Sequence, residues 1–209
     1  MARPLRTGRP EAFSDGVFAI AITLLVLELS VPTDVRDGLL HAIAEQWPSY
    51  LAYVISFAAI GATWLAHTGI THHLRAMDPG LVRLNLLVLL LVSLMPFTTA
   101  LTAAHIRDEG AERVAVVVFG CNLVLVAAAV SSLWRYALRR GLVDPDLDDE
   151  EVRGLTTRLT PGVAGYVGLI LLGLALPRLA VFGYLALSLA LLVPVGLRGE
   201  WPTRPPGSE

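Results

Sequence analysis

The chain has 209 residues, of which 55% are hydrophobic and only 16% are charged, with a formal net charge of −2 and a mean hydropathy of +0.63. A soluble domain has about 25% charged residues, so this composition excludes an ordinary soluble protein and indicates an integral membrane protein. The basic residues flank apolar runs and do not form one basic face, which argues against a nucleic-acid partner.

Six apolar runs follow one another along the chain, and a helix needs about 20 residues to cross a hydrocarbon core of about 30 Å. We therefore expect an all-α, polytopic membrane protein with six transmembrane helices per subunit, formed by residues 1–197. Only Pro177 and Arg178 separate the last two runs, which favours a tight helical hairpin over four crossings with two re-entrant pieces. The expected spans are about 13–31, 47–70, 81–104, 113–137, 160–177 and 179–197.

The first run, "RPEAFSDGVFAIAITLLVLELSV" (residues 9–31), carries polar groups that a simple lipid anchor does not need. Ser14 or Asp15 can cap the backbone N–H groups at the start of a helix. A carboxylate at the edge of hydrocarbon is costly unless it is paired, and Arg9 is the obvious partner for Asp15.

A helical wheel places Asp15 nearly opposite an apolar face that carries a single hydroxyl. If that face lined a pore, Glu28 near its outer end would bias the mouth toward cations. Thr23 also has a simpler explanation, because a threonine in a membrane helix commonly bonds its own backbone carbonyl one turn earlier. The face comprises Gly16, Ile20, Thr23, Leu24, Leu27 and Val31.

The longest connection, residues 138–159, contains an acidic run from Asp146 to Glu151. We expect it to be a solvated loop or the first turn of a short helix, not a cation site. The tail 198–209, "RGEWPTRPPGSE", is rich in Pro, Gly and charge, and we expect a disordered cytoplasmic segment. The chain has no apparent internal repeat, so it gains symmetry most simply by oligomerising around an axis.

Arginine is unevenly divided between the two sides that six spans create, and the chain has no lysine. The positive-inside rule therefore puts both termini in the cytoplasm. The side with the termini carries Arg3, Arg6, Arg9, Arg75, Arg83, Arg135, Arg139, Arg140, Arg153, Arg158, Arg198 and Arg204, and the other side carries Arg36, Arg107, Arg113 and Arg178.

The heptapeptide "RPEAFSD", an Arg-x-x-x-Phe-Ser-Asp pattern, and its apolar sequel resemble the first-helix signature of the endosomal and lysosomal potassium channel family (transmembrane protein 175) in its bacterial form. The likeness continues with "WLAH" in the second run, with Asn85 at the opening of the third, and with "LMPFTTAL" later in that run. It covers roughly residues 9–101, and beyond them only the pattern of spans matches.

The resemblance implies a homotetramer in a bacterial plasma membrane, in which the first helices surround a central ion pathway. It implies a hydrophobic constriction at Ile20, a selectivity layer at Thr23 and a further apolar ring near Leu27. In a continuous α-helix the latter two lie about 4.5 and about 10.5 Å from Ile20 along the axis. The family's polar network, which anchors the first helix or gates the pore, is implied for Arg9, Phe13, Ser14, Asp15, Trp64, His67 and Asn85.

The implied function is a potassium-permeable cation channel, with K⁺ and other monovalent cations, membrane lipid and other copies of the chain as partners. In a poorly hydrated neck a cation must shed water, and K⁺ holds its hydration shell less tightly than Na⁺ does. The chain has no Thr-Val-Gly-Tyr-Gly filter, so we expect only a modest preference for K⁺ over Na⁺. No cofactor is expected, and no metal other than permeating K⁺.

A proton- or cation-coupled secondary transporter is the alternative. Carriers usually show paired, Gly- or Pro-broken helices and midplane charges in two matching halves, and this sequence shows neither. No nucleophile–base pair, zinc motif or phosphate-binding loop appears in the sequence, so we do not expect an enzyme.

Overall fold

The computed structural model describes residues 8–33, 36 and 38–193, and every regular element in them is a helix. The all-α expectation is therefore confirmed over the described residues. In chain order the elements are α1 (Gly8–Leu24), the 3₁₀-helix η1 (Leu25–Glu28), α2 (Leu39–Glu45), α3 (Trp47–His72), α4 (Pro79–Ser93), α5 (Met95–His105), α6 (Ala111–Arg139), α7 (Asp149–Ala175) and α8 (Pro177–Leu192).

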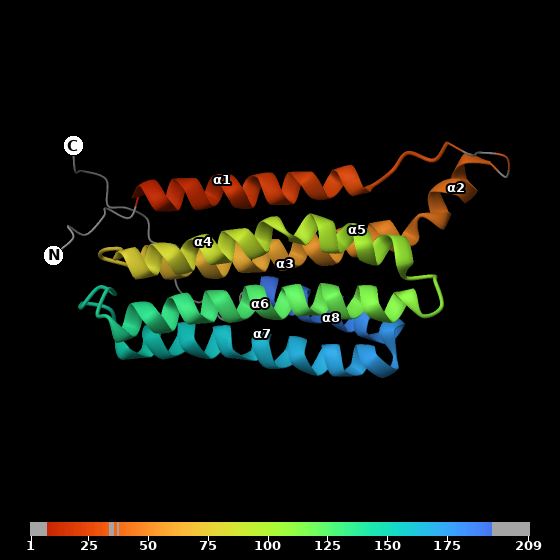
Figure 1. Ribbon diagram of the computed structural model, residues 1–209. Coiled ribbons are helices and arrows are strands. Elements are labelled where there is room, and N and C mark those ends of the chain that lie inside the picture. Colours follow the sequence, from red (N-terminus) through yellow and green to blue (C-terminus); the bar gives the residue numbers. More distant parts are fainter. Residues whose placement is uncertain (1–7, 34–35, 37, 194–209) are drawn as a thin grey trace.

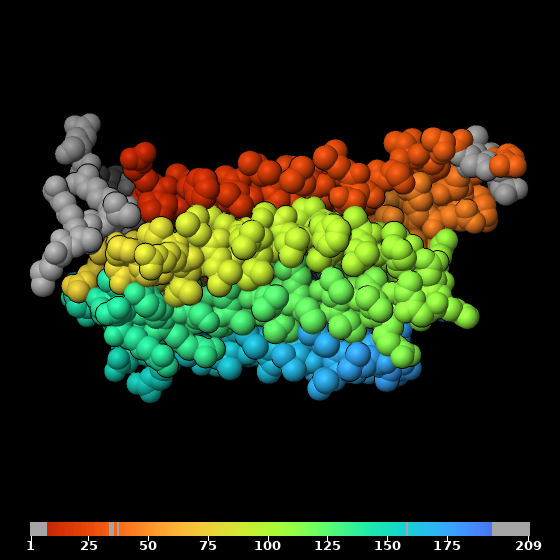
Figure 2. Space-filling model, in the orientation of Figure 1, coloured from red at the N-terminus to blue at the C-terminus, as the bar shows by residue number. Residues whose placement is uncertain are grey.

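The long helices lie side by side as a bundle, with α1 along one edge and α7 on the opposite side (Figure 1). α1 packs against α3, α4 and α5, whereas α6, α7 and α8 pack against one another and against α3. The space-filling view shows α1 as a ridge along the edge of the bundle (Figure 2). One side of this helix is therefore covered by its own chain and the other is not.

Five helical segments are long and apolar enough to cross a membrane, which agrees with five of the six expected spans. The sixth run forms α8, a shorter apolar helix of 16 residues, or about 24 Å at 1.5 Å per residue. The hairpin expected between the last two runs is present, because α7 and α8 pack together on either side of Leu176. Residues 194–197 of the expected last span, and the tail 198–209, lie outside the described residues.

The third span is interrupted at Leu94, between α4 and α5, which the sequence analysis did not anticipate. Pro96 has no N–H to donate to the Val92 carbonyl, and the Leu94 N–H bonds to that carbonyl instead. This is a single break in one span, and not the paired, Pro-broken helices in two matching halves that are typical of carriers.

Of the two expectations for the acidic run in the connection 138–159, the first turn of a helix agrees with the structure, but the helix is not short, because α7 begins at Asp149 and runs without a break into the fifth span. Three acidic residues, Asp149, Glu150 and Glu151, occupy its first turn. Negative charge there is favourable because the N-terminus of a helix carries partial positive charge. The acidic run therefore favours the start of a long helix.

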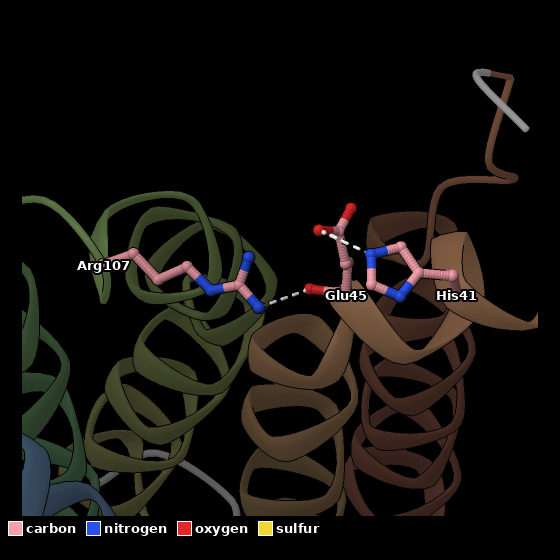
Figure 3. Close-up of polar contacts among 3 residues, drawn as sticks. All are labelled: His41, Glu45 and Arg107. Atoms are coloured by element: carbon pink, nitrogen blue, oxygen red, sulfur yellow. Dashed lines mark hydrogen bonds and ion pairs between the residues drawn. The ribbon is translucent and has the colours of Figure 1, made fainter. Parts of the chain in front are cut away.

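The short helix α2, which was also not predicted, lies at the end of the bundle where α5 ends (Figure 1). The guanidinium of Arg107 donates a hydrogen bond of 2.7 Å to the backbone carbonyl of Glu45 and lies 5.6 Å from the ring centroid of Trp47. The Glu45 carboxylate pairs with His41 at 3.4 Å (Figure 3). Arg107 thus joins the C-terminal end of α2 to the loop that follows the C-terminal end of α5.

Candidate pore face and polar network

The face of α1 that was predicted to line a pore is exposed in the single chain. The side chains of Ile20, Leu24 and Leu27 are 60%, 42% and 73% exposed. Large aliphatic side chains in a row with no cover from the described residues mark a surface that meets lipid or other copies of the chain. The remaining members, Gly16, Thr23 and Val31, are also exposed.

The opposite face of α1 is buried against the bundle. Ser14, Phe18, Ala21 and Leu25 recur at intervals of three or four residues and are at most 2% exposed. This spacing puts them on one side of a helix. The sequence of α1 therefore specifies which side packs inward and leaves the Ile20 side outward.

The 3₁₀-helix η1 changes the spacing expected along the exposed face. Beyond Leu24 the rise increases to about 2.0 Å per residue, so Leu27 lies about 12 Å from Ile20 along the axis, and not about 10.5 Å. A 3₁₀-helix turns about 120° per residue, so Leu27 still points in the same direction as Leu24. The exposed row therefore stays continuous but is longer than predicted.

Thr23 makes the local bond that was weighed against a pore role. Its hydroxyl donates to the backbone carbonyl of Ile20 at 2.9 Å. A hydroxyl whose proton is used in this way still has oxygen lone pairs available, and this side chain is exposed. The local bond and cation coordination are thus compatible, because they use different parts of the same hydroxyl.

Three of the expected network residues form a continuous hydrogen-bonded chain across α1, α3 and α4. The Asn85 amide nitrogen donates to Ser14 Oγ at 2.9 Å, and Ser14 donates in turn to the Pro10 carbonyl at 2.9 Å. The Asn85 amide oxygen lies 2.7 Å from His67 Nε2. Because an amide oxygen only accepts, this contact assigns the proton to His67 Nε2.

Asp15 and Trp64 form a second contact between α1 and α3, in which the indole N–H donates to Asp15 Oδ1 at 3.0 Å. The expected ion pair between Arg9 and Asp15 is absent from the described residues. Residues six apart on a helix point about 240° apart, so the two side chains face different sides. Phe13 is 58% exposed and does not take part in the hydrogen-bonded chain, and Glu28 is half-buried at the end of η1.

Sequence reasoning missed Phe18, which supports the network from one side. Its ring is 1% exposed and lies 5.4 Å from the ring of His67. Phe18 follows Ser14 by one helical turn, and that spacing was the available signal. His67 Nδ1 is buried and has no hydrogen-bond partner in the described part of the chain.

A second buried polar layer, also missed, joins α3, α5 and α6. Ser56 and Thr99 share a hydrogen bond of 2.6 Å, and the Asn122 amide donates to Thr98 at 3.3 Å. All four side chains are at most 3% exposed. These contacts join α5, the second half of the third span, to α3 and α6, because buried hydroxyls and amides in a membrane helix need hydrogen-bond partners.

Several known channel proteins are similar to this chain. The sequence model of the family described as "Endosomal/lysosomal potassium channel TMEM175" matches residues 9–96. A protein of Streptomyces collinus named as a potassium channel is 45% identical over 87% of this chain and 90% of its own length. A human protein named as the endosomal/lysosomal proton channel TMEM175 is 35% identical over 65% of this chain, but only 29% of the human protein is covered.

Among solved structures, the crystal structure of a lysosomal potassium-selective channel TMEM175 homolog from Chamaesiphon minutus superposes with a TM-score of 0.80. It is 37% identical, and the match covers 88% of this chain and 95% of the other. The similarity therefore extends over the whole bundle, including α6, α7 and α8, where the sequence resemblance was limited to the pattern of spans.

Proposed function

The chain belongs to the TMEM175 family of endosomal/lysosomal potassium channels, and we propose that it is itself a potassium-permeable cation channel. It is an integral membrane protein and not an enzyme. The observation that carries the proposal is the pairing of two faces on α1. One face is packed and hydrogen-bonded to α3 and α4, and the Ile20 face is left uncovered.

The proposed assembly is a homotetramer with α1 nearest the axis. Four uncovered Ile20 faces would then contact one another around the axis. Their aliphatic side chains would be covered by the other subunits and would enclose a narrow path. Ile20 and Leu27 form apolar constrictions, and Glu28 contributes negative charge near the outer mouth. Both termini lie in the cytoplasm of a bacterial cell, which the distribution of arginine supports.

Thr23 is proposed as the selectivity layer. Its hydroxyl donates to Ile20, so the oxygen lone pairs of four such side chains are free to replace part of the water that a cation loses at the Ile20 neck. Four hydroxyls are fewer ligands than a carbonyl cage provides. The proposed K⁺ over Na⁺ preference is accordingly modest.

The network of Ser14, Asn85 and His67, with the Asp15–Trp64 contact beside it, is proposed to hold the pore helix in place. Two of its hydrogen bonds, Asn85 to Ser14 and Trp64 to Asp15, join α1 to α4 and α3, and the His67–Asn85 bond joins α3 to α4 behind them. Arg9 and Phe13 are outside this hydrogen-bonded chain, and for them the proposed role is limited to the surface next to it.

Ile20→Asn tests the pore face most simply in a reconstituted vesicle assay of K⁺ flux. A polar side chain at the neck lowers the cost of cation entry, so we expect flux to rise and K⁺ over Na⁺ preference to fall. Leu90→Asn is the matched control, because Leu90 on α4 is 64% exposed and lies off the α1 face. Equal flux and selectivity in wild type and Ile20→Asn would refute the pore assignment.

The same vesicles separate the channel from its alternatives. Proton flux is measured in parallel with a pH-sensitive dye, because the human relative is named as a proton channel. A coupled transporter would saturate at carrier turnover rates and depend on a counter-substrate. Unsaturated K⁺ flux without a counter-substrate supports the channel, and strict coupling of K⁺ to protons contradicts it.

A further inference from the structure

An apolar crevice of about 430 Å³ lies between α3, α6, α7 and α8, all on the part of the bundle away from the exposed face of α1. Its walls include Ala62, Leu123, Pro161, Tyr166 and Leu192. This volume is within the range of about 300–1,000 Å³ that is usual for ligand pockets. An aliphatic cavity does not retain water, and an empty one forfeits van der Waals contacts along its walls.

The length of the crevice matches one leaflet of a membrane. Along α3 its lining runs from Ala59 to Gly69, and along α7 from Leu155 to Tyr166. At 1.5 Å per residue these stretches span about 15 Å and about 16 Å. The hydrocarbon core is about 30 Å thick, so the crevice is as deep as the acyl chains of one leaflet.

One end of the crevice is polar and the other is not. Thr157 lies three residues before the expected start of the fifth span at residue 160, which puts it at the level of lipid headgroups. Pro161 has no N–H, so the Thr157 carbonyl lacks its usual helical hydrogen bond from residue 161, and Thr157 is among the lining residues at this end. The deep end is lined by Ala59, Leu123 and Tyr166, whose hydroxyl is already hydrogen-bonded to Ser188 at 3.0 Å.

We propose that this crevice binds one acyl chain of a membrane phospholipid from the leaflet at the Thr157 end of the bundle. The hydrocarbon fills the aliphatic interior, and a hydroxyl or ammonium of the glycerol or headgroup region donates to the Thr157 carbonyl. A polar metabolite would leave its own groups unpaired against the aliphatic walls. The crevice is separate from the proposed ion pathway, so the test of lipid binding does not depend on channel activity.

The test uses the full chain in vesicles of phosphatidylglycerol and phosphatidylethanolamine, with a small fraction of phosphatidylglycerol that carries a diazirine near the end of one acyl chain. After illumination, mass spectrometry maps the labelled residues. We expect label on Tyr166 and Leu123 at the deep end, and a diazirine placed next to the glycerol should instead label residues near Thr157. Ala62→Phe, which fills the crevice, should reduce deep labelling at least about tenfold, corresponding to about 1.4 kcal/mol.

Ala186→Phe is the matched control, since Ala186 is exposed on α8 and does not line the crevice. It should leave labelling unchanged. If Ala62→Phe fails to fold, Ala66→Leu fills the same space with a smaller change of volume. The proposal would be overturned if the label were spread uniformly over the bundle surface, or if deep labelling survived both filling variants. It would also be overturned if another copy of the chain, and not lipid, occupied the crevice.

Discussion

Asn85 connects the pore helix to the rest of the subunit, so replacing it by leucine should loosen α1. The side chain is 2% exposed and bonds both Ser14 and His67. In Asn85→Leu the His67 Nε2–H loses the partner that it has among the described residues, and leaving such a donor buried costs about 1–3 kcal/mol. A hydrogen bond between membrane helices contributes only about 0.6 kcal/mol on average, so the loss of the bonds themselves adds little to that penalty. We therefore expect the free energy of unfolding to fall by about 1–3 kcal/mol in total.

The assay is a reversible SDS titration of the purified protein together with K⁺ flux in vesicles. Thr156→Val is the matched control, because it removes a half-buried hydrogen bond of 2.9 Å from the Trp134 indole, at the interface of α6 and α7. Both variants should lose stability, but only Asn85→Leu should change flux or selectivity. If Asn85→Leu matched wild type in both measurements, the network would not be what holds α1 in place.

Three further predictions concern separate parts of the chain. Thr23→Val should move the K⁺ over Na⁺ permeability ratio toward one while conduction persists, measured as reversal potentials in bilayers; an unchanged ratio removes Thr23 from the selectivity layer. Gly120→Ala should cost about 1–3 kcal/mol in the SDS titration, because its Cβ would meet the Tyr184 hydroxyl and Ile170, whereas Gly168→Ala, which meets nothing, should be neutral or stabilising. Burial tends to raise the pKa of Asp78, but hydrogen bonds from the Leu81 N–H and the Tyr136 hydroxyl outweigh it and lower that pKa. The stability from Asp78 is therefore present above its unfolded pKa of about 3.9 and lost as the pH falls through the lower folded value, so wild type should lose more stability on acidification than Asp78→Asn. Parallel pH profiles of the two proteins would contradict this account of Asp78.

The sequence predicted the parts of the fold that hydropathy controls. The long apolar runs became helices close to their expected places, because in lipid every backbone N–H and C=O must be satisfied within the segment. The break at Leu94 was missed because a proline in a membrane helix is compatible with either a continuous or an interrupted helix, and neighbouring contacts decide between them. The first turn of a helix was one of two expectations for the acidic run, but its continuity with the fifth span was missed because an acidic run also suits a solvated loop.

The candidate site was predictable only in part. The exposed Ile20 face follows from helical periodicity, since the opposite residues are the ones that pack. The contact of Ser14 with Asn85 joins residues 71 positions apart, and spacing along the chain carries no information about such pairs. The family resemblance indicated the members of the network, whereas the structure assigns their partners and replaces Arg9 by Trp64 beside Asp15.

The direct test of the central claim is an electron cryomicroscopy structure of the purified particle in a lipid nanodisc. Our account predicts four subunits with α1 of each nearest the symmetry axis, and with Ile20, Thr23 and Leu27 pointing toward it. A particle in which those three side chains contact lipid, or pack against a helix other than α1, would contradict it.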